Sequence, residues 1–82
     1  MYRARPGLLE TPLEDELVLL DTATRQMYSL NRTGGIVWRN LADPQRAEEE
    51  LARAYGIPPE QAEADVRALL ERLLARDLIE RV

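Results

Sequence analysis

The chain has 82 residues, of which 45% are hydrophobic and 32% charged, and its formal net charge is −4. A chain of this length forms one domain with a modest core and has little material for a deep catalytic cleft. Its composition is that of a folded globular domain rather than a disordered chain. Cysteine and histidine are both absent, which excludes disulfides and thiolate nucleophiles and makes zinc and triad chemistry unfavourable. We therefore expect a protein without a metal, a cofactor or enzymatic activity.

The charges and the apolar runs also restrict the partners. All eleven cations are arginines, and the second half of the chain is the more acidic. An acidic half repels phosphate backbones, so we expect weak affinity for nucleic acid. No apolar run approaches the roughly 20 residues that span a bilayer, and the N-terminus lacks the apolar segment of a secretory signal. These features predict a cytoplasmic protein without a membrane partner.

The N-terminal residues show little regularity. Residues 1–7 have no periodicity and contain a Pro-Gly pair, so we expect a flexible arm there, followed by one domain over residues 8–82. A short edge strand is expected over residues 7–12. It should stop at Pro12, because proline has no N–H for a strand ladder.

The next segment predicts an antiparallel hairpin. Residues 16–21 hold four consecutive aliphatic side chains between charged ones, a length and pattern typical of a strand. Asp and Thr side chains in residues 21–25 favour a turn, and residues 26–30 resume as a strand. If the strands pair in chain order, the strand over residues 26–30 has a free edge.

A helix should follow this strand almost without a linker. Asn31 is a good cap residue and Thr33 a second candidate, for a helix that runs to about Ala42. Gly34 and Gly35 at its start reduce helix propensity, so we expect them to let the helix lie close against the sheet.

Two further helices are predicted in the acidic half. Asp43 and Pro44 mark the start of a helix over residues 44–55, which Gly56 should terminate. A third helix over residues 59–76 carries leucines at three- and four-residue steps. Residues 77–82 alternate in polarity and could form a last short strand or a packed tail.

The order of elements predicts an α+β fold. We expect an N-terminal three-stranded antiparallel sheet followed by three helices, an arrangement similar to a winged helix-turn-helix. Such a fold raises the alternative of a DNA-binding regulator, in which Arg67, Arg72 and Arg76 of the third helix enter the major groove. Acidic residues on and beside that helix oppose this interpretation.

A small acid-base enzyme is a further alternative. Asp65 with Glu71, or Glu14 with Asp15, could act as paired carboxylates, but no apolar pocket with a partner base is evident beside them. A solvated surface is the simpler interpretation. The glutamates of residues 48–50 lack the spacing of a calcium loop and instead suit a helix N-terminus.

The free edge of the strand over residues 26–30 suggests a binding function. Natural proteins seldom leave such an edge bare, and a peptide could add to it as a further strand. Backbone hydrogen bonds would then supply affinity, and neighbouring pockets would supply selectivity. The physics alone leaves two other possibilities, namely that the N-terminal arm or a second copy covers the edge.

A set of short motifs in a fixed order resembles one known family. The motifs are Leu19-Leu20-Asp21, Tyr28-Ser29-Leu30-Asn31, Thr33-Gly34, Ile36-Val37-Trp38, Tyr55-Gly56, Asp65-Val66, Leu69-Leu70, Leu73 and Asp77-Leu78-Ile79. Together they are similar to the coenzyme PQQ synthesis protein D (PqqD) family over about residues 8–82. Each motif is weak, but their order and spacing are specific.

The resemblance implies a recognition element for ribosomally made, post-translationally modified peptides (RiPPs). Such a domain binds the leader of the precursor as an added strand, in a groove against the third helix, and presents the precursor to maturation enzymes. Carried onto this sequence, the leader-binding residues are Arg25, Gln26, Met27, Tyr28, Ser29, Leu30, Asp65, Val66, Leu69, Arg72, Leu73 and Arg76. The resemblance does not determine which face of the strand holds the anchor pockets.

The small size of the chain also narrows the pathway that the resemblance implies. A chain of this size with nothing fused to it looks most like the separate leader-binding B1 component of lasso-peptide biosynthesis. In those pathways a leader peptidase and an ATP-dependent cyclase carry out the chemistry, so both are expected partners. The alternative within the family is a peptide chaperone for a radical-SAM enzyme in PQQ-type maturation.

Overall fold

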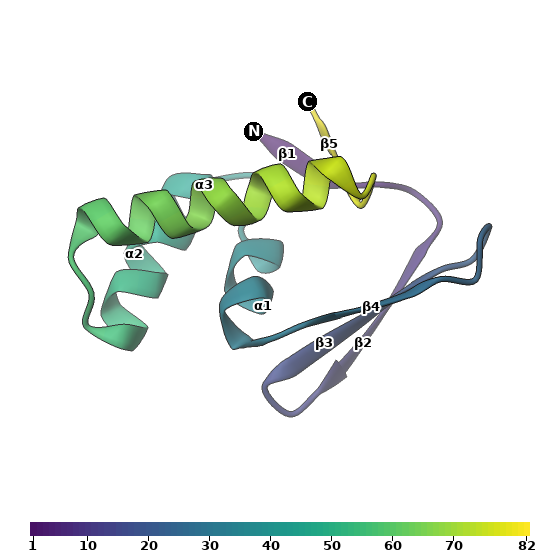
Figure 1. Ribbon diagram of the computed structural model, residues 1–82, viewed down its shortest axis with the longest axis horizontal. Coiled ribbons are helices and arrows are strands. Elements are labelled where there is room, and N and C mark those ends of the chain that lie inside the picture. Colours follow the sequence, from purple (N-terminus) through teal and green to yellow (C-terminus); the bar gives the residue numbers. More distant parts are fainter.

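Two small antiparallel sheets and three helices make up the fold in the computed structural model, which describes residues 1–82 (Figure 1). The elements in chain order are β1 (Tyr2–Ala4), β2 (Leu8–Leu13), β3 (Glu16–Asp21), β4 (Met27–Leu30), α1 (Arg32–Arg39), α2 (Pro44–Tyr55), α3 (Pro59–Ala75) and β5 (Ile79–Arg81). Helix α3 crosses the top of Figure 1, α1 and α2 lie below it, and strands β2 to β4 extend to one side. None of the helices is both long and apolar enough to cross a membrane.

The predicted hairpin and the order of its strands are confirmed. Strand β3 lies between β2 and β4, and both pairings are antiparallel. Leu17 lies opposite Leu30 and Leu19 opposite Tyr28, so these four side chains share the face that turns toward the helices. The other face of the sheet carries Met27, which is 69% exposed.

The prediction of a single three-stranded sheet is incomplete, because β1 and β5 form a second sheet. Residues 2–4 were expected in a flexible arm, but Tyr2 pairs with Arg81 and Ala4 with Ile79. The N–H of Tyr2 also donates to the carbonyl oxygen of Leu41 at 2.9 Å. A three-residue strand is too short to show periodicity, and its partner lies at the far end of the sequence, so no local pattern could predict this pairing. The two termini therefore lie side by side (Figure 1).

Helix α1 begins directly after β4, as predicted, and Asn31 is its cap. The Asn31 side-chain oxygen accepts the N–H of Gly34 at 2.9 Å. A Cβ atom on Gly34 would lie 3.0 Å from the Cβ of Leu30, so the glycine permits close contact between α1 and β4. Gly35 has no such role, because its added Cβ would approach only the flexible end of Arg39. The helix ends at Arg39, three residues before the predicted end.

Helices α2 and α3 agree with their predicted bounds to within one residue. Gly56 ends α2 with a left-handed backbone (φ 62°), as expected for a helix cap. The centre of the core joins all the main layers. Its most buried large side chains are Leu19 of β3, Val37 of α1, Leu51 of α2, Val66 of α3 and Leu78, which precedes β5. This shared core holds β4 and α3 at a fixed separation.

Candidate functional site

Strand β4 has one edge without a protein partner. It is the last strand in the order β2-β3-β4, and no further strand lies beyond it. The N–H of Asp21 donates to the carbonyl oxygen of Gln26 at 2.9 Å. This bond determines which residues of β4 direct their backbone groups toward β3. Because antiparallel pairs alternate, Tyr28 and Leu30 then bond to β3, whereas the N–H and C=O groups of Met27 and Ser29 point to the free edge. Four backbone groups are thus available to an added strand.

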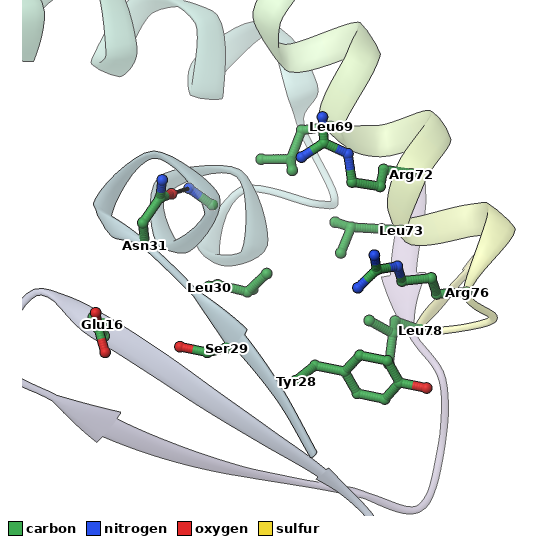
Figure 2. A pocket seen from close by; sticks show the side chains of 11 residues that line it. Glu16, Tyr28, Ser29, Leu30, Asn31, Leu69, Arg72, Leu73, Arg76 and Leu78 are labelled. Atoms are coloured by element: carbon green, nitrogen blue, oxygen red, sulfur yellow. Dashed lines mark hydrogen bonds between the residues drawn. The ribbon is translucent and has the colours of Figure 1, made fainter. Parts of the chain in front are cut away.

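The side chains of β4 alternate between two different environments. Leu30 is buried and Tyr28 is half-buried, and both face α3 (Figure 2). Met27 and Ser29 are exposed on the opposite face. The Tyr28 hydroxyl donates to the side-chain oxygen of Gln26 at 2.7 Å, which holds the ring at the end of the strand. The face of Tyr28 and Leu30 is therefore the one beside a hollow.

A groove of about 270 Å³ lies between the free side of β4 and the second half of α3 (Figure 2). We call it the β4–α3 groove. Its apolar lining comes from Tyr28, Leu30, Leu69, Leu73 and Leu78. Its other lining residues are Glu16, Ser29, Asn31, Gly34, Arg72 and Arg76. The groove thus combines an apolar floor with charged groups at its rim and an unpaired strand edge.

The turn before β4 holds the start of this strand in place. Asp21 is buried, and its carboxylate accepts the N–H of Ala23 at 2.9 Å and that of Thr24 at 3.3 Å. These two bonds, with a smaller contribution from Arg5 at 3.7 Å, keep the pKa of the Asp21 carboxyl below its usual value. Arg25 completes the turn with a left-handed backbone (φ 63°). Strand β4 is therefore fixed at both ends, by this turn and by the cap of α1.

The structure brings together seven of the twelve residues expected to bind a leader. Those that line the groove are Tyr28, Leu30, Leu69, Arg72, Leu73 and Arg76, together with Ser29, whose side chain is directed away from α3. Arg25 and Gln26 belong to the turn, and Met27 contributes to the edge only through its backbone. Asp65 lies beside the groove, in a neighbouring hollow that it shares with Leu69 and Arg72.

Val66 does not lie where the family resemblance placed it. It is 1% exposed and belongs to the core rather than to the groove wall. The face of a long helix that meets the core cannot be separated by periodicity alone from the face that meets a groove, because both are apolar. Four lining residues were not expected, namely Glu16, Asn31, Gly34 and Leu78. The sequence indicates Asn31 and Gly34 as local features of a helix start, and only the tertiary contact places them in the groove.

The carboxylates considered for acid-base chemistry do not form a site. Asp65 and Glu71 are exposed on α3, and Glu14 and Asp15 form the exposed turn between β2 and β3. No group of three or more acidic side chains is arranged to hold a metal ion. The arginines of α3 also differ from a basic DNA-reading face, since Arg67 pairs with Glu63 at 2.7 Å.

Comparisons with known proteins agree with this architecture. The family model described as coenzyme PQQ synthesis protein D (PqqD) matches residues 16–79, which is most of the chain. A solved structure of a lasso peptide synthetase B1 complexed with the leader peptide has 25% identity and a TM-score of 0.86 over 98% of each chain. TbiB1 in complex with the TbiA(beta) leader peptide has 23% identity and a TM-score of 0.86, over 98% of this chain and 96% of that chain. No curated protein matches the chain.

Proposed function

Because the chain belongs to the coenzyme PQQ synthesis protein D family, we propose that it is a non-catalytic protein that binds the leader of a ribosomally made precursor peptide. The observation that carries the proposal is the free edge of β4 beside the β4–α3 groove. An added strand would satisfy the outward N–H and C=O groups of Met27 and Ser29, and its alternate side chains would enter the groove. Solved structures with this fold hold a leader peptide, which supports the same role here.

The affinity of such a site comes from two sources. Each backbone hydrogen bond contributes about 0.5–1.5 kcal/mol net, and each well-buried apolar anchor about 1.5–3 kcal/mol. Strand β4 is fixed by the Asp21 turn and by the Asn31 cap, so little entropy is lost on the protein side when the leader binds. The site is thus suited to a flexible peptide that becomes ordered as it binds.

The similar solved structures support a place in one pathway. Two solved structures of leader-bound B1 proteins, one of them from a lasso peptide synthetase, resemble the whole chain, so we place the protein in lasso-peptide biosynthesis. It would present the precursor to a leader peptidase and a cyclase, in the cytoplasm where precursors are synthesised. A peptide chaperone for a radical-SAM enzyme is the second candidate, because the family is described by PQQ synthesis.

The fold also supports description as a variant of the winged helix-turn-helix. Helices α2 and α3 form the helix pair, joined through Gly56, and the β2–β3 hairpin takes the place of a wing. A DNA-binding function is disfavoured, since Arg72 and Arg76 line the groove beside β4 and the chain is acidic overall.

Calorimetric titration with a synthetic leader tests the proposal. The suitable probe is the leader of the lasso-type precursor encoded nearest to this protein's gene, with a scrambled peptide of the same composition as the control. We expect saturable one-to-one binding of the leader alone. An affinity weaker than about 100 µM, which corresponds to a free energy near −5.5 kcal/mol, would reject leader binding.

A further inference from the structure

The β4–α3 groove differs in charge from the other main hollows of the protein. Its charged lining consists of two arginines, Arg72 and Arg76, and one carboxylate, Glu16. Two other hollows each have three carboxylates and two arginines, and the fourth has one of each. The groove is therefore the one basic hollow among the four, in a chain whose net charge is −4.

Neither of these arginines has an acidic partner within the protein. The three ion pairs of the structure are Arg3–Glu80, Arg5–Asp21 and Arg67–Glu63. Figure 2 shows Arg72 and Arg76 extending from α3 toward the space beside β4, with Glu16 on the far side of that strand. Asp65 lines the neighbouring hollow with Arg72 but forms no ion pair with it. Two cations at the rim of the groove are thus free to meet a ligand.

The spacing of the arginines matches the repeat of a bound strand. Arg72 lies in the last turn of α3 and Arg76 is its C-cap; residues four apart on a helix are separated by about 6 Å along its axis, so the two arginines are about one turn apart. Alternate residues of a strand are about 6.6 Å apart and point to the same side. Leu69 and Leu73 form a second row at the same spacing, immediately beside the arginines on α3. Each of these arginines follows a groove leucine by three residues, about 4.5 Å further along the helix, so a strand along α3 can place one side chain on the leucines and the next side chain of the same face within reach of an arginine.

We propose that the groove selects leader segments in which an acidic residue lies two positions from an apolar anchor, with Arg72 and Arg76 as the residues that recognise the carboxylate. This inference rests on the proposed leader-binding function and specifies the chemistry of the ligand. The apolar side chain packs on Leu69 and Leu73, while the carboxylate accepts hydrogen bonds from a guanidinium group at the rim. The two arginines act as specificity determinants because an uncharged leader leaves them solvated, without a gain in binding free energy.

A peptide selection tests this inference without knowledge of the natural leader. A phage library of random 12-residue peptides is selected on the wild-type protein, and the enriched peptides are counter-screened on Ser29→Pro, which blocks the free edge. We expect the enriched peptides that depend on this edge to carry Asp or Glu two positions from an aliphatic or aromatic residue. A parallel selection on the Arg72→Gln/Arg76→Gln double variant should lose the acidic preference and keep the apolar one.

Isosteric peptides then measure the effect of the charge. For the most enriched peptide, replacing the acidic residue by its amide should raise Kd roughly 2- to 5-fold per arginine engaged, and more strongly at 50 mM than at 500 mM salt. On the double variant the acid and amide peptides should bind equally. Arg53→Gln/Arg46→Gln is the matched control, because it removes two arginines of α2 that lie away from the groove, and it should retain the full difference.

The outcomes separate this inference from the proposed function. Edge-dependent peptides without an acidic preference, or an acid–amide difference that persists in the Arg72→Gln/Arg76→Gln variant, would overturn the selectivity and leave leader binding intact. Failure to enrich any peptide that depends on the β4 edge would overturn both.

Discussion

The substitution Ser29→Pro tests the free edge of β4 without disturbing the pairing of β4 with β3. The Ser29 N–H points away from β3, so proline removes a donor at the free edge without removing a bond of the existing ladder. At the adjacent position the situation is reversed. Proline at Tyr28 would remove a bond to Leu19 within the sheet, so we expect that variant to be unfolded or strongly destabilised.

The expected loss of leader binding in Ser29→Pro has two causes: one backbone hydrogen bond is lost, and the proline ring hinders the approach of the added strand. A backbone hydrogen bond contributes about 0.5–1.5 kcal/mol net, and leaving the peptide's acceptor buried without a donor costs about 1–3 kcal/mol. A loss of about 1–3 kcal/mol corresponds to a Kd raised roughly 5- to 150-fold. Ser29→Ala is the matched control. It removes an exposed hydroxyl and keeps the N–H, so its Kd should stay within about 2-fold of wild type.

Fluorescence anisotropy with a labelled leader peptide provides the Kd values, and circular dichroism with urea unfolding shows whether each variant is folded. The reasoning would be refuted by a folded Ser29→Pro protein that binds the leader as tightly as wild type. An equal loss in Ser29→Ala would also refute it, because the hydroxyl rather than the N–H would then carry the contact.

Three further predictions concern the scaffold that holds the site. Gly34→Ala places a Cβ 3.0 Å from that of Leu30 and should destabilise the protein by about 1–3 kcal/mol, whereas Gly35→Ala should be tolerated; urea unfolding compares the two. The pKa of Asp21 is lowered in the folded protein, so its carboxylate contributes its full stabilisation above the unfolded pKa of about 4. This contribution is lost as the pH falls through the lower folded pKa. Asp21→Asn should therefore flatten the pH dependence of the urea midpoint between pH 2 and 6. A variant whose urea midpoint falls on acidification as steeply as that of the wild type would contradict this. Deleting residues 1–5 removes the partner of β5 and should lower Tm measurably, while an unchanged Tm would show that the β1–β5 sheet contributes no stability.

Local chemistry made much of the fold predictable. Asn31 as a cap, Gly56 as a left-handed helix end and the aliphatic run of residues 16–21 each have a direct physical preference for the structure they adopt. The free edge of β4 was also predictable, because consecutive strands joined by short turns pair in chain order.

Contacts between distant segments were not predictable. The pairing of β1 with β5 joins the two ends of the sequence, and neither strand is long enough to show a pattern. The placement of Val66 in the core rather than in the groove depends on how α3 is rotated about its axis, which its apolar positions leave open. The alternation of β4 defines two faces, and only the position of α3 beside Tyr28 and Leu30 determines which of them lines the groove.

Amide hydrogen exchange at β4, measured by NMR, is the most direct test of whether the leader binds as an added strand at the free edge. In the free protein the N–H groups of Met27 and Ser29 lie at an open edge and should exchange rapidly, while those of Tyr28 and Leu30 are protected by β3. Saturating leader peptide should protect Met27 and Ser29 and leave the other two almost unchanged. Rapid exchange at Met27 and Ser29 in the saturated complex would contradict strand addition at this edge.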